Sequence, residues 1–286
     1  MSPWSPSSAF TAQDTLRIPY PLWLAMTDLV NGQSVDATAR AALNERSLLI
    51  DGIPNPLLIN TFDAIANPYA GVRLEVAGPQ FVHACGIYPG RSATAIAQVI
   101  GSPPADLEDS EVEVATTFSD HVPAFICQYA QLGPRPALQG EQTAVPFKPA
   151  IELSDAHPGL RASAALTIAD ALQGAQPASA EHLRSGHWRA CYLNLVARPD
   201  ISIGRAWIDT PAGVLYYADT RESGRLLRTK HEVLLEPSSG ADVLIEIVNM
   251  WQGMAGTALT PPDLTLARDG RSGETLSESE GSHPDD

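Results

Sequence analysis

The chain has 286 residues and carries 33 acidic against 18 basic side chains, a formal net charge of −15 at pH 7. This length allows one large domain or two small ones. A strongly negative surface repels nucleic-acid phosphates and anionic lipids, so neither nucleic acid nor membrane is expected as a partner.

The sequence contains no run of about 18 apolar residues, so no membrane-spanning helix is expected. Three cysteines lie far apart and cannot all pair with one another, which indicates small buried side chains in a reducing compartment. We therefore expect a cytoplasmic protein.

The first half of the chain predicts helices followed by strands. Residues 1–15 are rich in Ser and Pro and are expected to be flexible. Capping residues and apolar periodicity predict helices over residues 22–30, 36–46 and 55–66. Alternating apolar residues then predict strands over 72–76, 81–87, 93–100 and 111–118, and the last leads into a helix over 119–132.

The second half repeats this order after a proline-rich stretch, residues 133–157, which we interpret as a connector. Helices are predicted over 158–172 and 179–184. Strands are predicted over 188–195, 205–210, 214–219 and 229–235, followed by a helix capped by Ser238 or Ser239. The acidic tail, residues 257–286, is expected to be disordered.

Corresponding strands share an offset of roughly 120 residues, far longer than a solenoid repeat and close to half the chain. It relates Val72 to Leu193 and Val112 to Val233. We therefore expect an α+β fold of two similar halves, residues 16–132 and 158–256, with quasi-two-fold symmetry. Sequential hairpins imply a mainly antiparallel central sheet with helices gathered to one side or end.

The sequence shows no familiar catalytic signature. It contains no HExxH or CxxC metal motif, no glycine-rich phosphate loop and no GxSxG elbow. The carboxylates of residues 106–111 suit a solvated loop better than paired acid–base catalysis. We expect no enzyme, no cofactor and no metal. A site assembled in space from distant residues, in a two-lobed enzyme or small-ligand-binding protein, stays open as the alternative.

Bulky residues of the second half are the candidates for contact with a partner protein: Trp207, Leu215 and Tyr217. Tyr and Trp concentrate at interface centres. Because Tyr216 and Tyr217 are adjacent on a strand, one of them should face outward. Plain core packing is the competing interpretation of these side chains.

Several blocks of the sequence resemble the EspG family, the specificity chaperones of type VII (ESX) secretion in mycobacteria and relatives. The blocks are Leu22-Trp23, residues 43–50 with 54–68, Ala206-Trp207-Ile208-Asp209-Thr210-Pro211-Ala212-Gly213, and the closing Pro237-Ser238-Ser239 helix. Ser47 stands where we would expect glycine in the family pattern. The resemblance covers about residues 16–254.

The resemblance implies a quasi-two-fold α+β fold and a cytosolic chaperone. Such proteins bind PE–PPE heterodimers at an apolar tip of the PPE helical bundle and keep them soluble for their own secretion system. It implies no cofactor. Trp207, Leu215, Tyr217 and the closing helices are the expected contact region. A weak homodimer is a further expected partner state of the protein.

Overall fold

The computed structural model describes residues 15–100, 110–197, 201–218 and 231–259. The stretches expected to be flexible or disordered therefore lie almost wholly outside the described residues, as does the acidic loop at 106–109.

Ten strands form one sheet in which every neighbouring pair is antiparallel. Across the sheet the strands are β1 (Thr15–Pro19), β7 (Glu111–Thr117), β6 (Thr94–Ile100), β5 (Phe81–Pro89), β4 (Ala70–Gly78), β9 (Arg189–Ala197), β10 (Ile201–Thr210), β11 (Gly213–Tyr217), β12 (Glu232–Ser238) and β8 (Thr143–Pro146). The prediction of an α+β fold with an antiparallel sheet is confirmed.

Helices precede and follow the runs of strands. They are α1 (Tyr20–Val30), α2 (Ala37–Glu45), α3 (Ile59–Ala66), α4 (Val122–Tyr129), α5 (Phe147–Glu152), α6 (Pro158–Leu172), α7 (Pro177–Arg184) and α9 (Gly240–Leu259). Short 3-10 turns, η2 (Pro56–Leu58) and η4 (Ser119–His121), lead into α3 and α4. A separate hairpin, β2 (Leu49–Ile50) with β3 (Ile53–Pro54), lies between α2 and η2.

Side-chain caps start the helices where the sequence predicts them. The Asp36 carboxylate accepts a hydrogen bond from the Ala39 amide at 2.9 Å at the start of α2. Before α9, the Ser239 hydroxyl oxygen accepts from the Asp242 amide at 3.1 Å, and Asp242 accepts from the Ser239 amide at 3.0 Å. These reciprocal bonds satisfy amides that have no partner inside the helix.

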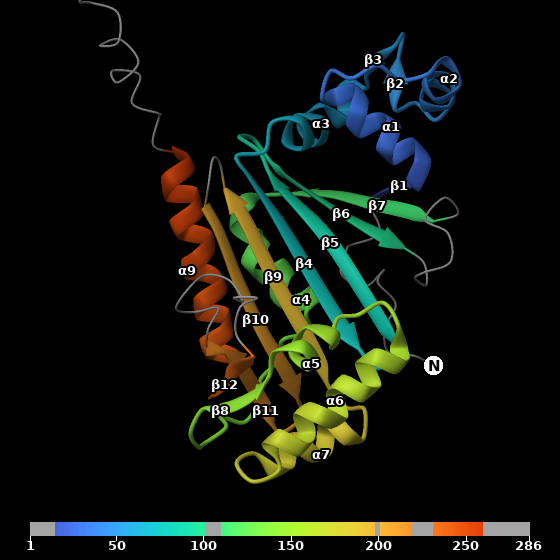
Figure 1. Ribbon diagram of the computed structural model, residues 1–286. Helices are drawn as coiled ribbons and strands as arrows, with labels where there is room; N and C mark the ends of the chain where they lie inside the picture. The colour runs from blue at the N-terminus through green and yellow to red at the C-terminus, as the bar shows by residue number, and fades with distance from the viewer. Residues whose placement is uncertain (1–14, 101–109, 198–200, 219–230, 260–286) are drawn as a thin grey trace, which may run out of the picture.

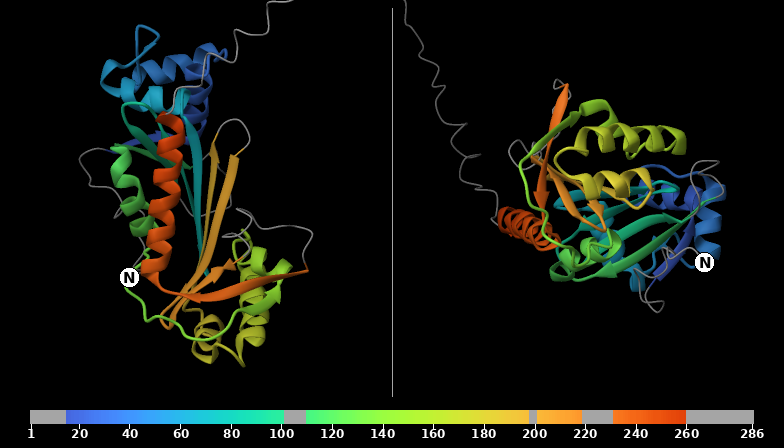
Figure 2. Two further views of the ribbon diagram at one scale, coloured as in Figure 1. Left: turned by 90° about the vertical axis from the view of Figure 1, so that its left-hand side faces the viewer. Right: turned by 90° about the horizontal axis from the view of Figure 1, so that it is seen from below.

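Helices cover both faces of the sheet, so the sheet is flanked by helices, and the expectation that they gather to one side or end is wrong. One face packs against α4 and α9. The opposite face packs against α1–α3 at the end formed by β1, β6 and β7, and against α5–α7 at the end formed by β8 and β10–β12. Figures 1 and 2 show α9 on the opposite side of the sheet from α6 and α7. We call the face toward α4 and α9 the back face and the other the front face.

The proline-rich connector contains two elements that the sequence pattern did not predict, β8 and α5. β8 is a short edge strand that pairs with β12, with Val145 opposite Val233. Four residues between turn-forming segments give too short an alternation to be recognised. Pairing with β12 is a long-range contact, which no local pattern reveals.

Candidate binding surface

The three residues proposed for partner contact are all 0% exposed. Trp207 belongs to the back-face core, whereas Leu215 and Tyr217 belong to the front-face core beneath α5–α7. The structure therefore places them on opposite faces of the sheet. A direct contact with a partner through these side chains would require the covering helices to move, so the exposed surface must be sought elsewhere.

Tyr216 and Tyr217 point to opposite faces, as adjacent strand residues must, yet both are fully buried. The expectation that one of them faces outward is wrong, because helices cover both faces at this end of the sheet. The Tyr217 hydroxyl donates to the Ala150 carbonyl at 3.3 Å, which ties β11 to α5. Core packing is what the structure shows for these residues.

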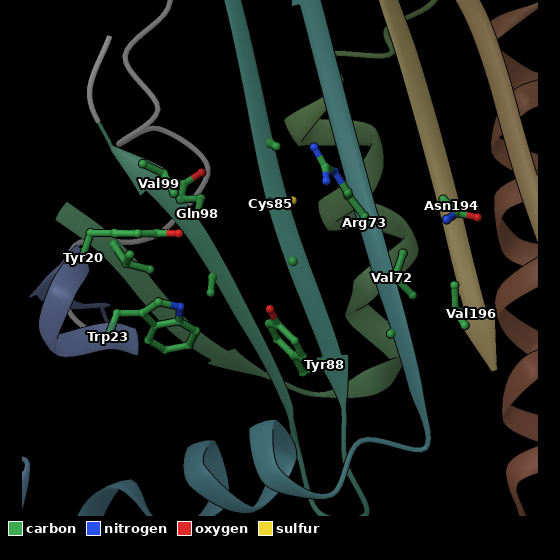
Figure 3. Close-up of a pocket in the computed structure, with 15 residues that line it drawn as sticks. Tyr20, Trp23, Val72, Arg73, Cys85, Tyr88, Gln98, Val99, Asn194 and Val196 are labelled. Carbon is green, nitrogen blue, oxygen red and sulfur yellow. The ribbon is translucent and has the colours of Figure 1, made fainter. Parts of the chain in front are cut away.

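The centre of the front face is not covered by a helix. Next to α1 on this face lies a cleft of about 640 Å³, which is lined by residues of α1, β4–β7 and β9. Strands β4, β5, β6 and β9 form its floor, and α4 lies behind them (Figure 3). It is a concave surface on a part of the sheet that α1 borders and no helix covers (Figure 1).

Small residues make up much of the floor. Gly71, Ala84 and Gly86 line the cleft, and Gly204 lies beside it opposite Asn194. Side chains of this size let the backbone of a bound segment approach the sheet closely. The floor therefore suits a bulky partner surface, such as the end of a helix, better than a flat strand.

The polar residues that line this cleft include Arg73, Asn194 and Tyr88 (Figure 3). The Arg73 side chain is 69% exposed, and its guanidinium donates to the Glu75 carboxylate at 2.9 Å. The Ser202 hydroxyl donates to the Asn194 side-chain oxygen at 3.2 Å. Burial raises the pKa of the Tyr88 phenol, so this hydroxyl keeps its proton near neutral pH.

Apolar side chains border the polar centre. Tyr20 and Trp23 of α1 lie with Val99 at one side of the cleft, and Val196 lies at the other, where it is 50% exposed (Figure 3). An aromatic and aliphatic border around a few polar groups is a common composition for a protein-binding surface.

Sequence reasoning did not single out Arg73, Asn194 and Tyr88, which line the cleft. A signal was present, because Arg73 and Glu75 alternate with buried Val72, Leu74 and Val76 and so had to lie on the other face. The sequence pattern could not show that β4 pairs with β9 at the centre of the sheet. Nor could it show that helices leave this stretch uncovered.

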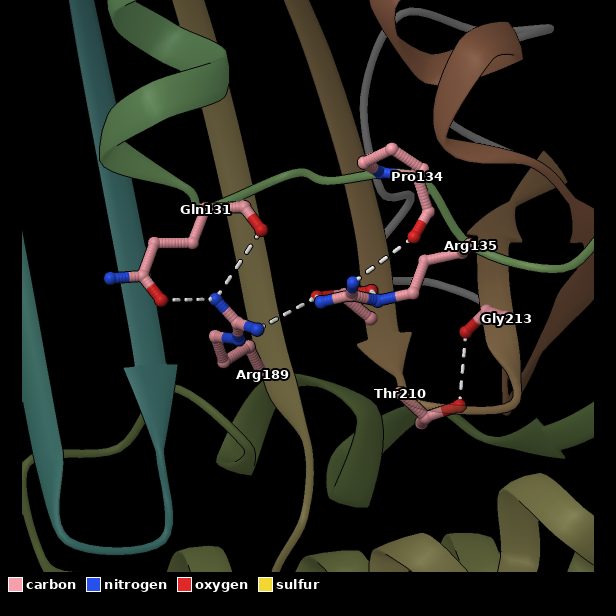
Figure 4. A network of polar contacts seen from close by, with 7 residues as sticks. Gln131, Pro134, Arg135, Arg189, Thr210 and Gly213 are labelled. Atoms are coloured by element: carbon pink, nitrogen blue, oxygen red, sulfur yellow. Dashed lines mark hydrogen bonds and ion pairs between the residues drawn. The ribbon is translucent and has the colours of Figure 1, made fainter. Parts of the chain in front are cut away.

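A smaller cavity of about 250 Å³ bears on the enzyme alternative, because His187, Arg189 and Asp209 line it. Asp209 is buried and accepts from Arg135 at 2.9 and 3.1 Å, and it pairs with Arg189 at 3.3 Å. Figure 4 shows Arg189 also bonded to Gln131. Burial raises the pKa of Asp209, and the two guanidinium groups oppose that rise.

This network fastens the connector to the sheet, since Arg135 lies in the connector and Asp209 at the end of β10. A carboxylate held by two guanidinium groups has its oxygens occupied and is a poor general base. His187, the histidine in this cavity, lies 3.0 Å from the Ser185 hydroxyl oxygen. The arrangement therefore favours a structural role over acid–base chemistry.

A second exposed apolar surface lies on the β2–β3 hairpin and the segment after it. We call Ile50, Ile53, Leu57 and Ile59 the hairpin tip; Leu57 is 92% exposed. Asn55 fixes this segment by donating to the Ser47 carbonyl at 2.7 Å and accepting from the Leu57 amide at 3.0 Å. The tip projects from the α1–α3 lobe away from the sheet (Figure 1). It is a projecting surface, unlike the cleft.

Within the described ranges, no three His, Cys, Asp or Glu side chains lie close enough together to hold a metal ion. Over the same part of the chain, none of the helices has the length and apolar character needed to cross a bilayer. Cys85 and Cys191 are buried, and both are free thiols whose pKa burial raises.

The chain matches no protein-family model, and comparison with curated proteins also finds no match. The resemblance to the EspG family therefore stays a prediction from the sequence blocks.

Proposed function

We propose that the chain is a cytoplasmic, EspG-like chaperone for type VII secretion that binds PE–PPE heterodimers. In this proposal the apolar tip of the PPE helical bundle enters the cleft on the front face of the sheet. The uncovered sheet floor beside α1 is the observation that carries the proposal. A carrier of this kind shields an apolar patch that would otherwise drive aggregation.

The composition of the cleft supports a reversible carrier. Its floor offers small and polar side chains, and larger side chains that include Tyr20, Trp23, Val99 and Val196 border it. A few larger side chains at the border suit an interface of moderate size, which buries on the order of 1,200–2,000 Å² of surface in total. A chaperone must also release its client, and a moderate interface permits this.

The finer fold prediction is part of the same proposal: the two halves are related by a quasi-two-fold axis. Apart from the β2–β3 hairpin, which only the first half has among the described residues, the chain follows the same order from β1 to α4 and from β8 to α9: strand, helices, four strands and helix. Outward from the central pair β4 and β9, the strands are β5, β6, β7, β1 on one side and β10, β11, β12, β8 on the other.

The ladder register supports this axis. The offset that relates Val72 to Leu193 also relates Arg73 to Asn194, and these two residues are directly paired between β4 and β9. A two-fold axis between antiparallel strands must cross the sheet at such a pair of counterparts. The proposed axis therefore runs through the floor of the cleft.

One backbone conformation supports the family resemblance. Ser47 has φ 57°, a left-handed conformation that glycine adopts more easily than other residues. It stands at the position where the family pattern would have glycine. The backbone here thus suits the residue of the family pattern, although the residue itself differs.

Co-expression with PE–PPE pairs from the same genome tests the function. We expect one pair to co-elute with the chain as a ternary complex on size exclusion, and to become insoluble when the chain is omitted. If the folded chain binds none of the pairs, the chaperone function is wrong. Turnover of a small molecule at the Asp209 cavity would favour the enzyme alternative instead.

A further inference from the structure

We propose that Tyr88, Arg73 and Asn194 bind the carboxyl-terminal end of an α-helix in the client, through the free main-chain carbonyls of its last turn. We call these three residues the polar row. This inference rests on the proposed function, and it names the part of the client that contacts the centre of the cleft.

The polar row follows one line across the sheet. Arg73 pairs with Gly86 of β5 on one side and with Asn194 of β9 on the other. Directly opposed residues of antiparallel strands point to the same face and lie about 4.5–5.5 Å apart. A Cβ atom at Gly86 would lie 2.7 Å from the Tyr88 hydroxyl, so this hydroxyl lies over Gly86 and beside Arg73.

The row is rich in donors. Arg73 gives a single N–H to Glu75, and a guanidinium has further N–H groups and no acceptor. The oxygen of the Asn194 amide already accepts from Ser202, which leaves the NH₂ group facing the cleft. Within the described ranges these remaining N–H groups have no hydrogen-bond acceptor. A bound segment that supplies acceptors therefore complements the row.

Charge decides which acceptors fit. Glu75 lies beside Arg73 and balances its charge, so a client carboxylate would meet a carboxylate already in place. Helix carbonyls carry no full charge and therefore meet less of this repulsion. The last turn of a helix has carbonyls without intrahelical partners, and together they carry a partial negative charge.

Space decides which segment can reach the row. The same line across the sheet continues through Ala97 beyond Gly86 and through Gly204 beyond Asn194. Ala97 and Gly204 are both small, so no large side chain stands beside the donors on either side. The end of a helix, which is wider than an extended chain, can therefore approach the row with its carbonyls pointing at the sheet.

Two variants test the row in the full chain with a PE–PPE pair that the wild type binds. Asn194→Asp replaces the two N–H donors with an acceptor of the same shape, and Arg73→Ala removes the guanidinium. We expect each to weaken client binding about tenfold or more, because losing a hydrogen bond to a charged or buried group costs a binding free energy that corresponds to such a change in the dissociation constant. Asn60→Asp is the matched control, since it makes the same chemical change at an exposed position of α3.

The readout is the dissociation constant by biolayer interferometry, with a thermal melt for each variant. Asn60→Asp should bind as the wild type does, and all melts should agree within a few degrees. Wild-type affinity in both Asn194→Asp and Arg73→Ala would overturn the inference while the proposed function stands. If the wild type binds no pair at all, both the function and this inference are wrong.

A change in the client separates carbonyls from carboxylates. Asp and Glu residues at the client's tip are replaced by Asn and Gln, and binding to the wild-type chain is measured. We expect less than a threefold change, because main-chain carbonyls are untouched by these substitutions. A loss of tenfold or more would assign the row to a carboxylate and overturn the inference.

Discussion

At the scale of single residues, burial separates what a side chain could contact from what it does contact. Trp207 has the size and chemistry of an interface anchor, yet it is 0% exposed in the back-face core. Its indole N–H has no hydrogen-bond partner within the described part of the chain. The residue therefore contributes through packing alone.

Trp207→Ala should lower the free energy of unfolding by about 3–5 kcal/mol, because it leaves a large cavity in a packed core. Trp207→Phe should cost less, since the ring still fills most of the site and no hydrogen bond is lost. Urea unfolding measures both. Client binding by the folded fraction should stay as in the wild type, and a selective loss of binding without loss of stability would contradict a core role.

Arg161 is a second residue whose role only the structure reveals. It is 2% exposed, and its guanidinium donates to the carbonyls of Gly78 and Pro79 at 2.9 and 3.1 Å. It also donates to the carbonyls of Asp155 and Ala156 at 2.6 and 2.8 Å. One side chain thus joins the β4–β5 turn of the first half to the start of α6 in the second.

Arg161→Ala should destabilise the protein by about 3 kcal/mol, because it leaves several buried carbonyls without a donor. Arg184→Ala is the control: it breaks an ion pair with Asp170, whose side chain is 77% exposed, and should cost less than about 1 kcal/mol. Chemical denaturation of both variants gives the comparison. Equal effects would show that the Arg161 bonds add nothing beyond an exposed ion pair.

At the scale of elements, β8 and α5 show which elements a local sequence pattern cannot predict. The long helices and the central strands follow from periodicity and capping, because each carries its own repeated apolar signal. β8 has four residues, and its existence depends on β12 offering an open edge. The Arg135–Asp209 ion pair then holds the connector against the sheet, so the segment is fixed although its sequence looks like a linker.

At the scale of the whole molecule, the cleft exists because the helical lobes cover the ends of a wide sheet and leave its centre open. A filled cleft should not bind a client. Ala84 of β5 lines the floor, and Ala84→Phe adds a ring on the open side, where no core must rearrange. We expect binding of a PE–PPE pair to fall at least tenfold, with little change in the melting temperature.

Ala84→Ser is the control for Ala84→Phe, since it changes the same residue with almost no change in volume. It should bind the client as the wild type does. Pull-down and thermal melting on both variants make the comparison. Undiminished binding by Ala84→Phe would show that clients attach elsewhere, for which the hairpin tip is the next surface to test.

The sequence by itself determined the α+β class, the positions of most helices and strands, and the inward face of each central strand. These are local properties, because they follow from the period of the apolar residues and from the helix-capping residues. Val72, Leu74 and Val76, for example, mark the buried face of their strand without reference to any other segment. It also predicted that all three cysteines are buried, which is confirmed for Cys85 and Cys191, whereas Cys127 is only partly buried.

Only the tertiary structure decided which strand pairs with which, and hence where the surface lies open. The pairing of β4 with β9 brings Arg73 beside Asn194 across more than a hundred residues of chain. The helices of both halves bury Trp207, Leu215 and Tyr217. Exposure is a property of all the segments around a residue, so a strand's own pattern can show which face a side chain takes but not whether another element covers it.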